Sequence, residues 1–153
     1  MEQKGVTYDV GTVTGISWRP EFDPRVVQRE LAIIKSDPRC TAVRISGRDV
    51  RRLTGAAETA LAQGMEVWLL PTLWNQSPRP TLVYMTKAAG AAEKLRARWP
   101  EQVVFLAGGE LTWFMQRIIP GKSIMQRLQY MMAGDAVKSG LHNKPLNAQE
   151  AKE

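Results

Sequence analysis

The sequence holds one cysteine and one histidine, and both scarcities exclude classes of protein. Cys40 has no second cysteine with which to form an internal disulfide, so a small secreted scaffold stapled by disulfides is excluded. His142 stands alone near the end of the chain, far from Cys40 in sequence. Neither a Cys-His dyad nor a zinc site is therefore predicted, and no metal or other cofactor is expected.

Long apolar runs are also missing. Segments such as 67–70 are far shorter than the roughly 18 to 20 apolar residues of a membrane helix. The first twenty residues lack the basic, apolar and small-residue zones of a signal peptide. We therefore expect a cytoplasmic protein with no membrane partner.

Nucleotide-binding fingerprints are absent, and the positive charge is not concentrated. The glycines of segment 11–15 do not have the G-x-G-x-x-G spacing, and no P-loop motif occurs. The formal net charge of +6 favours polyanions in a general way. Because the arginines are scattered through predicted helices instead of forming one block, nucleic acid is not an expected partner.

What remains is a regular alternation of strands and helices in 153 residues, 44% of them hydrophobic. Strands are predicted at 6–10, 40–46, 65–70 and 103–107, and helices at 24 to about 36, 50–63, 81–99 and 123–132. Asp23 and Pro24 have the residue types of a helix N-cap and first turn. The strand at 65–70 is nearly all apolar, which is typical of a strand covered on both faces, so Trp68 is expected in the core.

The spacing of these elements predicts the fold class. Strands begin about 26 to 37 residues apart, which is the spacing of successive βα units in a TIM barrel. We predict an α/β fold for residues 1–133, a partial (half) TIM-type (β/α) barrel with four parallel strands, each followed by a helix. Residues 134–153 are polar without apolar periodicity and are expected to form a disordered tail.

Polar and aromatic residues follow the predicted strands, where loops of parallel sheets converge. This set suits a polar, ring-shaped ligand such as a carbohydrate, and it comprises Tyr8, Asp9, Arg44, Trp74, Asn75, Glu110 and Trp113. Glu110 has two interpretations, a cap of the helix that begins at Leu111 or a general acid/base. Asp9 either binds a nearby backbone N–H or pairs with an arginine such as Arg44.

Several segments together resemble a known family, namely 5–11, 19–23, 40–47, 64–68 and 104–111. The chain resembles, over about residues 4 to 130, actinobacterial proteins often labelled abortive infection proteins, which are similar to glycoside-hydrolase (β/α)8 barrels. The resemblance implies that Glu110 stands where retaining glycosidases have the acid/base of strand four. The clan of retaining glycosidases usually has Asn directly before this Glu, whereas this chain has Gly109 at that position. The label also implies phage defence.

These observations lead to one leading hypothesis and one alternative. The leading hypothesis is a fragment of a glycoside-hydrolase-like barrel, weakly active or inactive alone because the nucleophile of strand seven is missing. A half-barrel leaves its strand edges and its inner face uncovered. A homodimer, a complementing half-barrel or rearrangement into a flat sheet would cover them. The remaining explanation, which we favour here, is that the chain is a truncated reading frame. The alternative is a noncatalytic module that binds carbohydrate or polyanions.

Overall fold

The computed structural model describes residues 4–13, 16–17, 19–36 and 40–132. The described chain forms two compact units. Of the described residues, the first contains those from Lys4 to Thr72 together with Tyr84–Gly109, and the second contains Leu73–Val83 and those from Glu110 to Met132. The expected tail at 134–153 lies outside the described residues. In the part of the chain that is described, no helix has the length and apolar character needed to cross a membrane.

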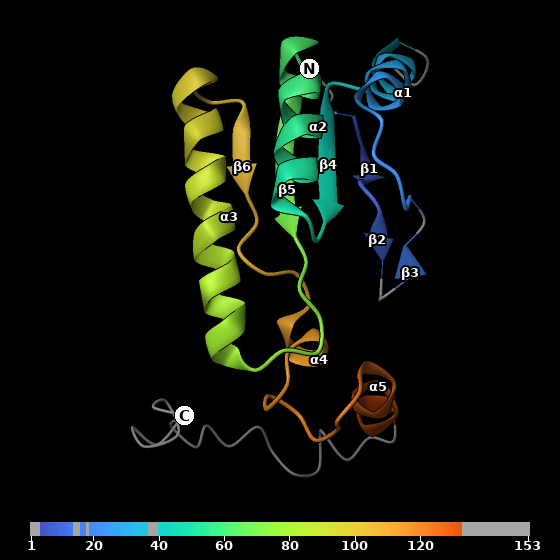
Figure 1. Ribbon diagram of the computed structural model, residues 1–153, viewed down its shortest axis with the longest axis vertical. Helices are drawn as coiled ribbons and strands as arrows, with labels where there is room; N and C mark the ends of the chain where they lie inside the picture. Colours follow the sequence, from blue (N-terminus) through green and yellow to red (C-terminus); the bar gives the residue numbers. More distant parts are fainter. Residues whose placement is uncertain (1–3, 14–15, 18, 37–39, 133–153) are drawn as a thin grey trace. The chain divides into compact units, whose positions relative to one another are not determined.

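The first unit contains a parallel four-stranded sheet (Figure 1). Its strands are β1 (Gly5–Asp9), β4 (Ala42–Gly47), β5 (Glu66–Pro71) and β6 (Val103–Phe105), in the order β1-β4-β5-β6. Each is followed along the chain by a helix, which confirms the predicted α/β class. A short antiparallel hairpin, β2 (Thr12–Val13) and β3 (Ile16–Ser17), was not predicted from the sequence.

Three helices of the predicted kind follow the first three strands. They are α1 (Pro24–Ser36), α2 (Val50–Ala62) and α3 (Pro78–Arg98), of which the part from Tyr84 belongs to the first unit. The Asp23 carboxylate accepts the backbone N–H of Arg25 at 2.8 Å, as the predicted cap requires. Asp49 caps α2 in the same manner, and Gly64 follows α2 with a φ of 74° that favours glycine.

All three helices cover the same face of the sheet, and the hydrophobic core lies between them. The fully buried side chains there include Leu31 of α1, Val43 and Ile45 of β4, and Val67 of β5, all at 0% exposure. Burying one such aliphatic side chain contributes about 1.5–3 kcal/mol to folding. This packing holds β1, β4 and β5 in register. It therefore also determines which side chains of these strands lie on the opposite face of the sheet.

The opposite face of the sheet is exposed. Thr7, Arg44 and Trp68 lie directly across from one another on β1, β4 and β5, and all three are exposed. Trp68 exposes 39% of its surface, so its predicted core position is wrong. The strand alternates its side chains between the two faces, and only the face with Val67 and Leu69 meets helices. We call this exposed side of the sheet the open face.

The second unit is built from a short helix, α4 (Leu111–Phe114), and α5 (Ile124–Met132), with the segment before α3 and its first residues. The predicted helix at 123–132 is confirmed, but its burial differs from the expected pattern. The buried residue of α5 is Arg127, whereas Met131 and Met132 are exposed. A polar side chain therefore occupies the centre of this unit.

Candidate functional site

Asp9 and Ser46 lie side by side where β1 and β4 end. Asp9 Oδ1 accepts the backbone N–H of Gly11 at 2.7 Å, and Asp9 Oδ2 accepts the Ser46 hydroxyl at 3.2 Å. The predicted bond of Asp9 to a nearby backbone N–H is confirmed. The alternative pairing with Arg44 is wrong, because Arg44 lies opposite Thr7, two residues before the end of β1.

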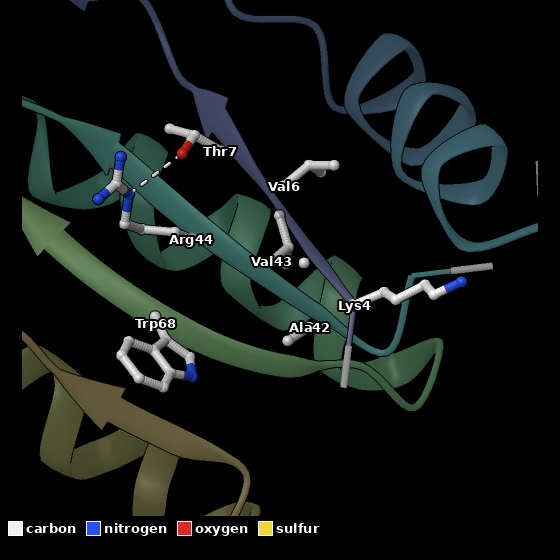
Figure 2. A pocket seen from close by; sticks show the side chains of 8 residues that line it. Lys4, Val6, Thr7, Ala42, Val43, Arg44 and Trp68 are labelled. Atoms are coloured by element: carbon white, nitrogen blue, oxygen red, sulfur yellow. Dashed lines mark hydrogen bonds between the residues drawn. The ribbon is translucent and has the colours of Figure 1, made fainter. Parts of the chain in front are cut away.

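Arg44 and Trp68 are neighbours on the open face. Arg44 Nε donates to Thr7 Oγ1 at 3.1 Å, and no carboxylate among the described residues forms an ion pair with this guanidinium. The indole N–H of Trp68 donates to a carboxylate oxygen of Glu66 on the same strand. Figure 2 shows Arg44 and Trp68 on adjacent strands, while the Lys4 ammonium points away from both.

A hollow of about 260 Å³ lies over these side chains. It is lined by residues of β1, β4 and β5 and by Lys4, and we call it the Arg44–Trp68 hollow. The guanidinium keeps N–H donors beyond the one used by Thr7, and the indole offers an apolar ring surface. Such a pair can bind a polar ring or an anionic group, because one partner supplies hydrogen bonds and the other supplies contact area.

Tyr8 lies on the opposite side of β1 from Arg44. Its hydroxyl donates to Glu30 Oε2 at 2.6 Å, and Arg19 Nη1 donates to the same carboxylate oxygen at 2.7 Å and to the Tyr8 hydroxyl at 3.2 Å. Burial, reinforced by Glu30, raises the pKa of Tyr8. The hydrogen bond from Arg19 lowers the pKa of the Glu30 carboxyl. Tyr8 thus ties β1 to α1, and it is not part of the Arg44–Trp68 hollow.

The second unit brings together three of the predicted site residues, Trp74, Asn75 and Trp113. Phe114 links the two indoles, since its ring stacks on Trp113 with centroids 4.8 Å apart and meets Trp74 edge-on at 6.2 Å. The backbone N–H of Asn75 donates to Phe114 O at 2.8 Å. These three predicted site residues lie together within this unit, and their binding of a ligand stays a prediction.

Arg127 is buried beside this cluster and forms hydrogen bonds with it. Its guanidinium donates to Trp113 O at 2.6 Å, to Gly121 O at 2.9 Å and to Asn75 Oδ1 at 3.2 Å. Burial lowers the pKa of Arg127. Sequence reasoning missed this residue, because an arginine in an amphipathic segment is ordinarily exposed and no local pattern marks it as buried.

Glu110 precedes α4 and belongs to the second unit. It takes the N-cap position with a left-handed φ of 53°, and its side chain makes no capping hydrogen bond. The interpretation of Glu110 as a side-chain cap is therefore wrong; its backbone carbonyl instead accepts N–H groups of Trp113 and Phe114. The carboxylate is exposed and has no partner among the described residues.

Gly109, which the suggested resemblance would place where retaining glycosidases have Asn, belongs to the first unit. A Cβ built on Gly109 would lie 3.1 Å from Leu70 Cδ1. This approach is tighter than an ordinary contact, so any side chain here requires a shift of Leu70.

Comparison with known proteins adds no relatives. No protein-family model matches this chain, and no curated protein matches it. The resemblance to abortive infection proteins consequently stays a hypothesis, and the function has to be argued from the residues of the two units.

Proposed function

We propose that the chain is one half of a glycoside-hydrolase-like (β/α) barrel, related to the proteins labelled abortive infection proteins. The observation that carries this is the sheet itself: four parallel strands have helices on one face and an open face with Asp9, Ser46, Arg44 and Trp68 on the other. In complete barrels of this type the helices lie outside and the strand ends carry the site residues.

On its own such a half has weak hydrolase activity or none. A retaining glycosidase needs two carboxylates about 5–5.5 Å apart, one as acid/base and one as nucleophile. Glu110 is the acid/base in this proposal, since its carboxylate is exposed and no capping bond occupies it. The second carboxylate has to come from a complementing half.

The proposal is tested with aryl glycosides of several sugars, using the wild-type chain, Glu110→Gln and Glu101→Gln. Glu101 is a matched control, because it is also exposed and also has a positive φ, here 69°. We expect a weak rate that Glu110→Gln abolishes and Glu101→Gln leaves unchanged. A measurable rate that is equal in all three proteins removes Glu110 from the mechanism and contradicts the catalytic part of the proposal.

The second candidate function is carbohydrate binding without catalysis, and the Arg44–Trp68 hollow favours it. Its donors and its ring surface are exposed in the chain as described. Isothermal titration with neutral and acidic oligosaccharides should give binding that Arg44→Ala weakens at least tenfold. The control Arg51→Ala changes an arginine on α2, away from the open face, and should bind as wild type. A steep loss of binding with added salt would indicate polyanion recognition instead of sugar recognition.

A further inference from the structure

The sheet of the first unit ends in two free strand edges among the described residues, β1 and β6. At the β1 edge, Lys4 O accepts the N–H of Ala42, and Val10 N donates to Ser46 O. The even-numbered residues of β1 thus bond to β4. Because successive backbone groups of a strand point to opposite sides, the N–H and C=O groups of Thr7 point away from the sheet.

The β6 edge has the complementary arrangement. Gln102 O accepts the N–H of Val67, and Leu106 N donates to Leu69 O, so the even-numbered residues of this segment bond to β5. The backbone groups of Val103 and Phe105 therefore point outward. These two residues carry their side chains on the helix-covered face, whereas Thr7 carries its side chain on the open face. A parallel joint between the two edges therefore keeps each face of the sheet continuous.

We propose that a second copy of this chain closes the sheet, with β1 of each copy pairing in parallel with β6 of the other around a two-fold axis. The inference rests on the half-barrel part of the proposed function, and it names what closes the sheet into a barrel. Two copies supply eight strands, the number at which side chains just fill the interior of a barrel. A closed arrangement also removes the free edges that otherwise promote uncontrolled strand addition.

The composition of the open face favours this occupant. Its β5 and β6 part carries the large apolar side chains of Trp68, Leu70 and Val104 together with Glu66, whereas its β1 and β4 part carries Thr7, Asp9, Arg44 and Ser46. In the two-fold arrangement each joint places the part of one copy with the large apolar side chains beside β1 and β4 of the other. Among the described residues of this face, Arg44 is the one arginine, and it forms no ion pair with a carboxylate. Closure by a second copy adds the Asp9 and Glu66 carboxylates of that copy to the enclosed face.

Two variants of one edge residue test the pairing. Thr7→Pro removes an outward N–H, and proline is tolerated at a strand edge whose N–H faces solvent. Thr7→Ala is the matched control, because it also loses the Arg44 hydrogen bond but keeps the N–H. Light scattering after size exclusion should give twice 17.1 kDa for wild type and Thr7→Ala. Thr7→Pro should weaken the dimer at least tenfold, with far-UV circular dichroism unchanged.

A second measurement covers the case in which Thr7→Pro does not fold. Hydrogen exchange of the wild-type chain should show the outward amides of Val103 and Phe105 protected at high concentration and unprotected on dilution. A monomer at every concentration overturns the inference, and so does a dimer that Thr7→Pro does not weaken and in which these amides are unprotected.

A monomer that still hydrolyses glycosides through Glu110 refutes closure by a second copy and leaves the proposed function standing. A Thr7-sensitive dimer without hydrolysis or sugar binding supports closure and contradicts the proposed function.

Discussion

The two units of this chain bury different kinds of side chain. In the first, the fully buried side chains are aliphatic, such as Leu31, Val43 and Ile45. Among the described residues of the second, the fully buried side chain is Arg127, while Met125 and Met132 expose 62% and 79% of their surface. The first unit is organised by the hydrophobic effect and the second by a polar hub that satisfies backbone carbonyls. Apolar periodicity therefore describes the interior of only one of them.

The largest expected effect is in the aliphatic core. Ile45→Ala should lower the free energy of unfolding by about 2–5 kcal/mol, because it leaves a cavity at a fully buried position. Its neighbour Arg44 points to the open face, so Arg44→Ala should change the stability by less than about 0.5 kcal/mol. Chemical denaturation followed by circular dichroism measures both, and similar losses for the two variants would contradict the division of the sheet into a packed and an open face.

Arg127→Met tests the polar hub. It leaves the carbonyls of Trp113 and Gly121 without their donor inside the second unit, which should cost about 1–3 kcal/mol. Hydrogen exchange should accelerate in segment 111–132 of this variant and stay unchanged in β4 and β5. Arg79→Met, at an exposed position of the same unit, is the control. An unchanged exchange pattern in Arg127→Met would mean that the hub contributes nothing.

Tyr8→Phe tests whether a polar contact also matters in the first unit. The variant removes the hydroxyl that donates to Glu30 and should lower the free energy of unfolding by about 0.5–1.5 kcal/mol. A double-mutant cycle with Glu30→Gln isolates the pairwise energy. Additive losses in the cycle would show that the hydroxyl and the carboxylate do not stabilise each other.

The stability of the protein at acidic pH should report on the contacts of Glu30 with Arg19 and Tyr8. The folded-state pKa of Glu30 lies below its unfolded value, so its contribution is present above the unfolded pKa of about 4.3 and is lost as the pH falls through the folded pKa. The contact is partly exposed, and its contribution should stay under about 1 kcal/mol. Melting temperatures of wild type and Glu30→Gln should therefore differ at pH 6 and converge towards pH 2. A constant difference would contradict this.

The smallest effect is expected at Gly109. Gly109→Ala places a Cβ 3.1 Å from Leu70 Cδ1, and the flexible end of that side chain can move. The loss of stability should stay below about 1 kcal/mol, a few degrees or less in melting temperature. Leu70→Ala should relieve the crowding, so the second substitution would restore part of the loss. A large loss that Leu70→Ala does not relieve would point to backbone strain at this position.

Much of the first unit could be predicted from local signals. Asp23 with Pro24 marked the start of α1, Gly64 marked the end of α2, and the strand positions were correct to within a few residues. These signals are local because caps and turns depend on a few neighbouring backbone groups. Trp68 was placed wrongly because an apolar strand does not reveal which of its faces receives helices.

The candidate site was predicted less well. Asp9 and Ser46 meet because β1 and β4 pair in parallel register, which strand prediction anticipates only in outline. Tyr8 contacts Arg19 and Glu30, which lie 11 and 22 positions after it in the sequence. No sequence motif predicts these contacts. Arg127 and Asn75 lie 52 residues apart, so their bond depends entirely on how the second unit folds.

The sequence by itself determined the α/β class, the order of strands and helices and their caps, because hydrophobic periodicity and capping act over a few residues. Only the tertiary structure decided which face of the sheet is open, that Arg44 pairs with Thr7 and not with Asp9, and that Arg127 is buried. Those outcomes depend on strand register and on packing between segments that are distant in the sequence. The partners of each side chain then come from other segments, and the neighbouring residues in the sequence do not predict them.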